Sequence, residues 1–487
     1  MSSAPEVPIK RRPRDDGACG QRRSGGRMVR VSSPAPLAAV VALALALGGC
    51  ADGPVAATAS GGASSTGAGG AAPSCDVAAP TAWTTAIAVT PASRGALIDA
   101  AFAGVAATAG VAVAARLDGA DADVGATHLA APAAGSLDVL ARFDACGAPV
   151  WARAIPGIES VLAGTDADAA LVVDLLRASP DIDLTTFDAV TSDATASAHV
   201  DASCLFDGAP TAGPNGLVIL SGAFGDGGKA GVLLEPTLDP SSPSGISCAT
   251  PTAFGQYLVA IDASGKAAWM RKTAAGGPTT PISEAFAVAA DATRVAISTT
   301  LIGDLDLGTT TVTGSVDAPA PMTAVLDATG AAVWARTGVG GGVVALAADG
   351  SSAAFGACAT GLSIDRLDPT GASTWSLCTR AAGFGDAIAV SPDGAAVFVA
   401  GAFSGGHDLT GAPAVDHATY LAELVGGAVT DQRVFGGELE MAGLVPTPDG
   451  VVVAVENFGF GTVDFGQGPV GGARDQLILA HVLFASR

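Results

Sequence analysis

Histidine and carboxylate side chains are the residues of this 487-residue sequence whose types could hold a metal ion or move a proton. The five histidines are scattered, and only His407 and His417 lie near each other, beside Asp408 and Asp416. Imidazole and carboxylate groups are common metal ligands, so this segment is a candidate metal site. Because the two histidines fall in an expected loop and follow no zinc-type spacing, we interpret them as solvent-exposed.

Aspartates cluster at three places, and clustered carboxylates could bind a calcium ion. The clusters are Asp118 with Asp121 and Asp123, Asp181 with Asp183, and Asp304 with Asp306. None matches an EF-hand loop, which needs a central Gly and a closing Glu. Aspartates also recur at one position of a repeated corner, namely Asp123, Asp183, Asp306, Asp408 and Asp464. We therefore expect them to form turns by hydrogen-bonding their own backbone, and we predict no metal site.

The sequence contains no motif of a known catalytic or nucleotide-binding site. The glycine cluster Gly338–Val343 precedes neither a helix signal nor Lys-Ser/Thr, so it is not a phosphate-binding loop. There is no GxSxG elbow, no HExxH pair and no pair of glutamates spaced for acid–base work. We predict that the protein is not an enzyme and has no catalytic residue and no cofactor.

An internal repeat is the strongest pattern in the chain, and it indicates how the remaining residues are arranged. Asp precedes Gly by three residues and Trp by seven in four copies: Asp144, Gly147 and Trp151; Asp262, Gly265 and Trp269; Asp327, Gly330 and Trp334; Asp368, Gly371 and Trp375. The Asp side chain can accept hydrogen bonds from backbone amides two residues on, and Gly supplies the positive φ where the turn ends. Alternating apolar residues flank the turn, so each copy predicts a β-hairpin whose Trp packs between neighbouring sheets.

Two further recurring segments accompany each hairpin. One is an apolar strand, a turn and a second strand, clearest at Val390–Phe403, and the other is the Asp corner described above. A unit thus contains four antiparallel strands in roughly 40–60 residues, which predicts an all-β fold, a β-propeller of four-stranded antiparallel blades. Seven such openings predict seven blades, with six or eight as alternatives because residues 155–255 are irregular. A degraded hairpin with Gly426-Gly427 as its turn belongs to the same series.

The two ends of the folded domain are expected to share one sheet. The last unit ends at Leu477–Arg487 without a following Trp strand, whereas Thr81–Val89, around Trp83, has the composition of that missing strand. We predict that this N-terminal strand completes the last blade and closes the propeller, because closure removes exposed sheet edges. The alternative is that the strand packs elsewhere on the domain.

The Asp-x-x-Gly-x-x-x-Trp hairpin, preceded by a Pro-Asp-Gly turn and an apolar strand, resembles the bacterial β-propeller repeat of the SBBP type found in secreted and surface proteins. The resemblance covers most of residues 77–487, and four copies are clear. It implies a scaffold and no particular reaction. Quinoprotein dehydrogenases also have propeller repeats with Trp, but only the copy Asp262–Trp269 approximates theirs. A quinone-dependent dehydrogenase is therefore the weakest of the alternatives.

The N-terminal segment predicts export and a lipid anchor. Residues 37–48 form an apolar core of twelve, too short for the ~20 residues that span a bilayer, and arginines precede it. Leu47-Gly48-Gly49-Cys50 then resembles a bacterial lipobox, which implies cleavage before Cys50 and lipidation of its thiol. The alternative is an ordinary signal peptide with a chance Cys. We assign residues 1–27 to a non-native or basic extension, with Met1 or Met28 as the start, and residues 28–49 to the lipoprotein signal peptide.

Residues 50–76 are expected to form a flexible tether between the anchor and the folded domain. Positions 51–74 are almost all Gly, Ala and Ser, a composition that cannot bury a core. Ala51 after the anchor Cys favours the outer membrane by analogy with proteobacterial sorting. We therefore expect a cell-envelope location, at the outer membrane or cell surface, and assign residues 77–487 to the β-propeller domain.

Six cysteines remain after Cys19 and Cys50, an even number that predicts disulfides in an exported chain: Cys75, Cys146, Cys204, Cys248, Cys358 and Cys378. The repeat arrangement narrows the pairings. Cys358 and Cys378 would share one blade, and Cys204 and Cys248 flank an irregular insertion. Cys75 and Cys146 would meet where the chain ends join. None has the CxxC spacing of a zinc or redox site.

The charge of the mature chain argues against nucleic acid as a partner. Removing the eight basic and three acidic residues of positions 1–49 leaves 16 Lys/Arg and 43 Asp/Glu, a balance of about −27. Such a surface repels phosphate backbones and favours cations or basic partners.

Together these patterns predict a lipid-anchored β-propeller lipoprotein that acts as a non-enzymatic binding or scaffold module at the cell envelope. Loops from several blades would present a monomeric domain to a protein or glycan partner. The alternative is an extracellular polysaccharide-active hydrolase or lyase with carboxylates in the propeller channel.

Overall fold

The computed structural model describes most of the chain from residue 82 to residue 484. The described ranges are 82–90, 97–105, 110–132, 136–155, 159–164, 169–175, 181–188, 194–201, 204–205, 210–226, 232–250, 255–274, 286–301, 303–315, 319–381, 383–403, 406–413, 418–436, 439–457, 462–471 and 476–484. The predicted extension, signal peptide, lipidation site Cys50 and tether lie outside these ranges, as do Cys75 and His417.

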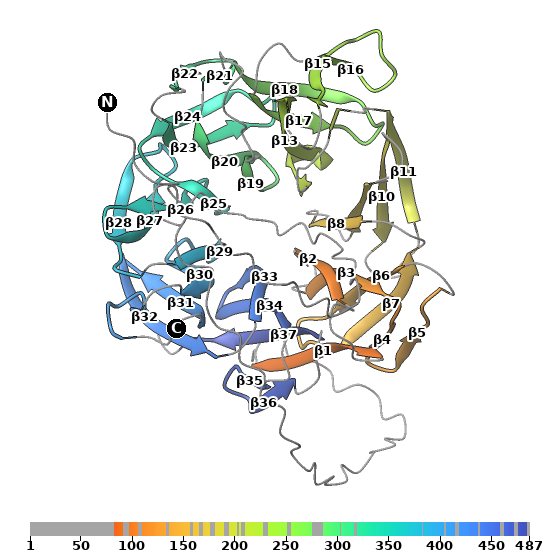
Figure 1. Ribbon diagram of the computed structural model, residues 1–487, viewed down its shortest axis with the longest axis vertical. Coiled ribbons are helices and arrows are strands. Elements are labelled where there is room, and N and C mark those ends of the chain that lie inside the picture. The colour runs from red at the N-terminus through yellow and green to blue at the C-terminus, as the bar shows by residue number, and fades with distance from the viewer. Residues whose placement is uncertain are drawn as a thin grey trace, which may run out of the picture. The chain divides into compact units, whose positions relative to one another are not determined.

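Antiparallel β-strands make up the secondary structure of the described residues, apart from one turn of 3₁₀-helix, η2 (Pro214–Gly216). Four neighbouring strands form the recurring unit (Figure 1). Five such units are separate four-stranded sheets, and two more lie within larger sheets. We number these units sheets 1 to 7 in chain order. The all-β prediction is confirmed.

The strand bounds of the seven units are as follows. Sheet 1 contains β2 (Leu97–Val105), β3 (Gly110–Asp118), β6 (Ser136–Phe143) and β7 (Pro149–Ile155), and sheet 2 contains β8 (Glu159–Gly164), β9 (Ala169–Leu175), β10 (Asp181–Asp188) and β11 (Ala194–Asp201). Sheet 3 contains β12 (Thr211–Ala212), β13 (Val218–Asp226), β17 (Gly255–Ile261) and β18 (Ala267–Ala274), and sheet 4 contains β19 (Ala287–Ala290), β20 (Arg294–Leu301), β23 (Ala320–Asp327) and β24 (Ala332–Thr337). Sheet 5 contains β25 (Gly341–Leu346), β26 (Ser352–Cys358), β27 (Gly361–Leu367) and β28 (Ser373–Cys378), and sheet 6 contains β29 (Gly383–Val390), β30 (Ala396–Phe403), β31 (Thr419–Val425) and β32 (Ala428–Phe435). Sheet 7 contains β33 (Leu439–Thr447), β34 (Gly450–Asn457), β37 (Gln476–Leu483) and β1 (Trp83–Thr90).

Short strands outside these units form hairpins or pair at their edges. They are β4 (Asp121–Val124), β5 (Thr127–Leu129), β14 (Val232–Leu233), β15 (Glu235–Leu238), β16 (Ile246–Ala249), β21 (Asp304–Asp306), β22 (Thr311–Val312), β35 (Thr462–Asp464) and β36 (Pro469–Gly471).

The repeated Asp-x-x-Gly segments form the turn between the third and fourth strands of a sheet, as predicted. In sheet 4 the amide of Gly330 donates to the carbonyl of Asp327, and the amide of Asp327 donates to the carbonyl of Ala331, each at 2.9 Å. The pairing of β23 with β24 changes register at this turn, between Val325 and Leu326. The same change occurs in sheets 1, 3, 5 and 6. The repeated spacing therefore encodes one turn geometry.

Inner strands of the sheets are covered on both faces by neighbouring sheets. Every residue of β17 and of β34 is buried, whereas exposed residues alternate with half-buried ones along the outer strand β28. One core cluster joins Leu258 of sheet 3 to Ile297 of sheet 4, and another joins Phe398 of sheet 6 to Val453 of sheet 7. Face-to-face packing explains why apolar residues run continuously in these strands, since each large aliphatic side chain contributes about 1.5–3 kcal/mol when fully buried.

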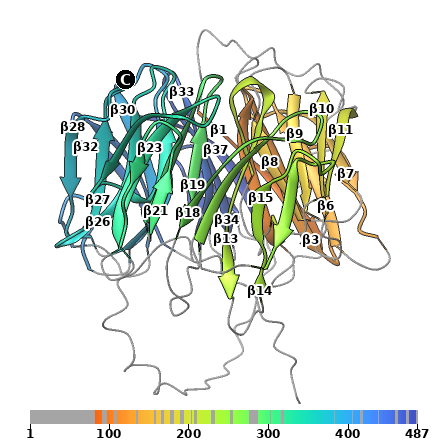
Figure 2. The ribbon, with the colours of Figure 1, turned by 90° about the horizontal axis from the view of Figure 1, so that it is seen from above.

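The two ends of the described chain pair in sheet 7, which confirms that the strand around Trp83 completes the last sheet. Strand β1 runs antiparallel to β37, with Trp83 opposite His481 and Ile87 opposite Leu477. Figure 1 shows β1 in orange beside β37 in blue, and Figure 2 shows the same sheets from above. The N-terminal strand therefore takes the fourth position of the sheet, which a Trp-bearing strand holds in sheets 1, 3, 4 and 5.

Three of the five predicted Asp corners lie in short hairpins: Asp123 in β4–β5, Asp306 in β21–β22 and Asp464 in β35–β36. Strand β4 pairs with β1 and β21 pairs with β18, so the first two hairpins extend the outer edges of sheets 7 and 3. The corner predicted at Asp183 is wrong. Asp183 lies inside β10, opposite Asp174 and His199, because the β-forming residues Thr185 to Phe187 continue the strand. Among the described residues, no helix has the length and apolar character needed to span a membrane.

Candidate functional site

The repeated aspartates use their side chains to hold their own turns. Oδ1 of Asp368 accepts hydrogen bonds from the hydroxyl of Thr370 at 2.7 Å and from the amides of Thr370 and Ala372 at 2.8 and 2.9 Å. These bonds, that of the Thr370 hydroxyl first, lower the pKa of Asp368 from its ordinary value. Asp262 and Asp327 make the same set of contacts. The side chain is thus a structural part of the turn.

The repeated tryptophans lie against the turn glycine of the next sheet in the chain. A Cβ placed on Gly330 would lie 2.5 Å from Cδ2 of Trp269, and one placed on Gly371 would lie 2.7 Å from Cδ2 of Trp334. The indole Nε1 of Trp269 also donates to the carbonyl of Ala328 at 3.0 Å. Because these glycines have a positive φ of 74° and 81° as well, two independent constraints exclude a side chain there. We call this arrangement the Trp–Gly contact.

An arginine two residues after the Trp binds the same turn in two of the joints. Nε of Arg271 donates to the carbonyl of Gly330 at 2.7 Å, and Nη1 of Arg336 donates to the carbonyl of Gly371 at 3.0 Å. Charged donors make stronger hydrogen bonds than neutral ones. The outer strand of one sheet therefore holds the next sheet through an aromatic face and a guanidinium group.

The remaining joints depart from this pattern in part. Trp375 lies against Gly427, where an added Cβ would be 3.3 Å from the indole Cγ, and Leu377 stands where an Arg is found in the other copies. At the turn of sheet 3, a Cβ on Gly265 would meet the carbonyl oxygen of His199 at 2.8 Å, so β11 contributes backbone instead of an indole. The turn that follows β10, which would face Trp151, lies outside the described residues.

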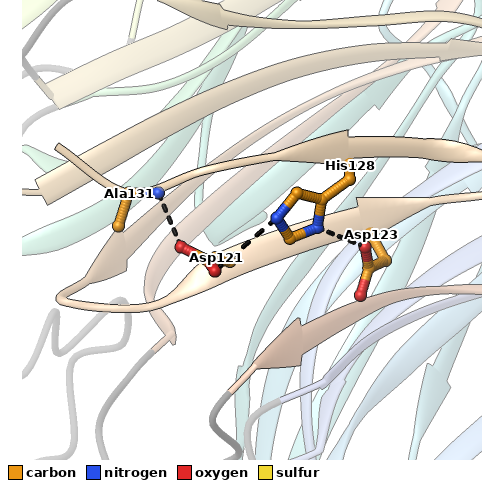
Figure 3. A network of polar contacts seen from close by, with 4 residues as sticks. All are labelled: Asp121, Asp123, His128 and Ala131. Atoms are coloured by element: carbon orange, nitrogen blue, oxygen red, sulfur yellow. Dashed lines mark hydrogen bonds and ion pairs between the residues drawn. The ribbon is translucent and has the colours of Figure 1, made fainter.

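His128 bridges two aspartates on the exposed hairpin β4–β5 (Figure 3). Its Nδ1 lies 2.7 Å from Oδ1 of Asp123, and its Nε2 lies 3.6 Å from Oδ2 of Asp121. Asp121 also accepts a 2.7 Å hydrogen bond from the amide of Ala131. The hydrogen bond to Asp123, aided by both negative charges, raises the pKa of His128 from its ordinary value. The two imidazole nitrogens of His128 therefore contact different carboxylates, Nδ1 that of Asp123 and Nε2 that of Asp121.

Asp386 and Glu440 form a carboxylate pair that the sequence analysis did not single out. They lie on β29 and β33, the first strands of sheets 6 and 7, which contact each other. Burial raises the pKa of Asp386 to about 7, and the charge of Glu440 adds to the rise. Burial and the charge of Asp386 also raise the pKa of Tyr420, which stacks on Phe403 at 4.5 Å. The sequence feature that could have revealed this pair is the single carboxylate in each of the otherwise uncharged strands β29 and β33.

The described residues contain no group of three or more His, Cys, Asp or Glu side chains arranged to hold a metal ion. Of the candidate histidine pair, His417 lies outside the described ranges, and His407 forms a β-bridge with Pro413. Asp304 and Asp306 lie at the two ends of the short strand β21. Asp306 accepts the amide of Gly308 at 2.8 Å, which is the turn-forming role expected of it.

Two disulfides join the cysteine pairs that the repeat arrangement favoured. Cys204 is bonded to Cys248, and Cys358 is bonded to Cys378 at the ends of β26 and β28 in sheet 5. Cys146 is also disulfide-bonded. Its predicted partner Cys75 lies outside the described residues, so that pairing stays a prediction.

Comparison with known proteins gives structural likeness and no family. No family model and no curated protein matches the sequence. Among solved structures, the chain is similar to the Dos1 propeller (TM-score 0.35, 10% identity, covering 71% of this chain and 75% of that one) and to Hsv2 of Kluyvelomyces marxianus (0.37, 10%, 80% and 100%). It is also similar to the acylaminoacyl peptidase of Pyrococcus horikoshii (0.40, 8%, 71% and 47%). At these TM-scores and identities the likenesses assign no activity.

Proposed function

We propose that this chain is an exported, lipid-anchored, seven-bladed β-propeller that acts as a non-enzymatic binding or scaffold module at the cell envelope. The observation that carries the proposal is the Trp–Gly contact. It assigns the most regular residues of the sequence to holding neighbouring sheets together, including Trp83 of sheet 7 against Gly147 of sheet 1. Because the repeated residues hold the sheets together, the loops between them are the part of the domain that can vary and face a partner.

The chemistry of the proposed partner follows from charge. The mature chain carries 43 acidic and 16 basic residues by the count above. The turn aspartates use Oδ1 for their own backbone amides. A protein or glycan with cationic groups would gain most from such a surface, and its binding would weaken with added salt.

The membrane part of the proposal rests on the sequence around Cys50. Expression of the full chain in a Gram-negative host with labelled palmitate tests it, with Cys50→Ser as the matched variant. We expect label and membrane association for the parent chain and neither for the variant. Labelling of both proteins, or of neither, would remove the lipid anchor from the proposal.

Capture from the envelope of the host with the mature domain tests the binding role. We expect a protein or glycan retained at low salt and released as salt rises. As a matched variant, the same domain carrying Lys in place of the exposed Asp118 and Asp304, which make none of the turn contacts described above, should retain less. A partner retained equally by both domains would show that these surface charges do not contribute.

One observation favours the alternative function, an extracellular polysaccharide hydrolase or lyase. Asp386, whose pKa is raised to about 7, and Glu440, on the neighbouring strand, differ in environment in the way that an acid and a base require. The test is release of reducing or unsaturated ends from a panel of acidic and neutral polysaccharides by the mature domain. Activity that Asp386→Asn abolishes while the fold is retained would establish this alternative over the binding role.

A further inference from the structure

Asp386 occupies an irregular position in the first strand of sheet 6. The pairing of β29 with β30 matches Gly385 to Gly401 and Ala387 to Ala400, so Asp386 is the extra residue of a β-bulge. Bulges redirect a side chain and interrupt the hydrogen-bond ladder. The first strand of sheet 7 has a bulge of its own, at Ala442 between Met441 and Gly443. Two neighbouring strands thus have weakened ladders near the carboxylate pair.

The surroundings of Asp386 disfavour its charge. A Cβ on Gly385 would lie 2.4 Å from the ring of Phe355, so this buried aromatic from sheet 5 covers the bulge. Asp386 itself is half-buried, and the fully buried Tyr420 lies on β31 in the same sheet. An ionised carboxylate in such a place loses hydration that apolar neighbours do not replace.

The elements packed against β29 supply no cation that offsets this charge. They are β25, β26, β27, β30 and β33. Strands β25, β26 and β30 have no ionisable side chain besides the disulfide-bonded Cys358, while β27 has Asp365 and Arg366. Arg366 donates to the hydroxyl of Ser351 and the carbonyl of Gly394. The group whose charge acts on Asp386 is Glu440 of β33, which is negative and exposed.

We propose that the contact between β29 and β33 is proton-sensitive: it is closed while Asp386 carries a proton and loosens when Asp386 and Glu440 are both ionised. The bulges provide strand segments that can move, and the repulsion between two carboxylates provides the driving force. Acid would tighten the joint between sheets 6 and 7, and neutral to alkaline pH would relax it. The inference does not depend on either proposed function, because it concerns stability and local opening.

The direction of the pH effect follows from linkage. The pKa of Asp386 is raised in the folded protein from 3.8 to about 7, so its contribution to stability is complete below pH 3.8 and is lost as pH rises to about 7. Between pH 5 and pH 8 this one group should raise the unfolding constant roughly tenfold to a hundredfold. His128 acts in the same direction, because its pKa is raised as well. The test must therefore isolate Asp386.

The experiment compares denaturant unfolding of the mature chain at pH 5 and pH 8 with that of Asp386→Asn and of Asp304→Asn, an exposed control on β21. We expect the parent chain and Asp304→Asn to lose at least tenfold in the unfolding equilibrium between these pH values, and Asp386→Asn to lose several-fold less. Equal losses in all three proteins would overturn the proposal.

A second measurement on the parent chain keeps the test decisive if Asp386→Asn does not fold. Carboxyl carbon NMR should show one aspartate that titrates near neutral pH, and Glu440→Gln should move that midpoint downward by removing the neighbouring charge. Amide exchange in β29 and β33, corrected for the intrinsic rate, should be faster at pH 8 than at pH 5. A spectrum in which every aspartate titrates below pH 5 would refute the proposal.

Discussion

The indole of Trp83 lies over Gly147, and its Nε1 donates a 2.8 Å hydrogen bond to the carbonyl of Ala145. Trp83 belongs to the N-terminal strand β1, whereas Gly147 ends the turn of sheet 1. Trp269 and Gly330 make the same contact between sheets 3 and 4. The joint between sheet 7 and sheet 1 is therefore built from the same contact as the joint between sheets 3 and 4, although its indole comes from β1, which precedes the other three strands of sheet 7 in the sequence.

The indole hydrogen bond should make a measurable contribution to the joint at Trp83. We expect Trp83→Phe to lower the free energy of unfolding by about 1 kcal/mol beyond the change in packing, because the carbonyl of Ala145 loses a donor. Trp334 gives the matched comparison, since its Nε1 is buried without a hydrogen-bond partner among the described residues. Trp334→Phe should cost less, as no hydrogen bond is lost. Denaturant unfolding measures both, and equal losses would mean that the indole N–H does not matter.

Sheet 5 depends on a disulfide that joins its second and fourth strands. Cys358 and Cys378 are 20 residues apart in sequence, and closing such a loop in the unfolded chain is worth about 3 kcal/mol. We expect Cys358→Ser with Cys378→Ser to lower the free energy of unfolding by about that amount. The pair Cys204 and Cys248, 44 residues apart, should be worth slightly more, about 4 kcal/mol. Thermal unfolding with and without reductant checks both, and a parent chain that reductant leaves unchanged would contradict the prediction.

The repeat made much of the fold predictable because each copy encodes the same local geometry. Asp327, Gly330 and the apolar residues around them specify a hairpin within eight positions, and turn chemistry of this kind does not depend on distant contacts. The partner of Trp269 was not predictable in the same way. It lies in the next repeat, on Gly330, and only the arrangement of whole sheets brings the two together.

The candidate site was less predictable than the fold. Asp386 lies in an apolar strand and matches no motif, and its pKa is raised by burial and by the charge of Glu440, 54 positions further along. The turn predicted at Asp183 was wrong for the opposite reason. Its local pattern resembled a corner, but the strand around it continues through three β-forming residues. Local spacing therefore predicted turns well, and it could not show which carboxylates would meet across sheets.

The protonation of His128 should depend mainly on Asp123. The hydrogen bond to Asp123 is the largest cause of its raised pKa, so Asp123→Asn should return the His128 pKa toward 6.5. Because the pKa is raised in the folded state, the stabilising effect is complete below pH 6.5 and is lost as pH rises through the raised value. Proton NMR of the imidazole measures the shift. Asp118→Asn, an exposed neighbour that does not act on His128, should leave the pKa unchanged, and a fall in that variant would contradict the assignment.

Gly330 and Gly411 separate the two requirements that a turn glycine meets. Both end an Asp-x-x-Gly turn with a φ of 74° and 84°, but Trp269 lies against Gly330, while a Cβ on Gly411 would meet nothing within 4 Å. Alanine should cost about 1–2 kcal/mol at Gly411 through left-handed strain alone. At Gly330 the indole adds a steric cost of about 1–3 kcal/mol.

We therefore expect Gly330→Ala to lower the free energy of unfolding by more than Gly411→Ala does, measured by denaturant unfolding at one pH. Combining Gly330→Ala with Trp269→Ala separates the two terms further, because removing the indole makes room for the new methyl group. In that background the Gly330 substitution should cost no more than the Gly411 substitution does in the parent chain. If Gly330→Ala still costs more than Gly411→Ala when the indole is absent, the excess does not come from contact with Trp269.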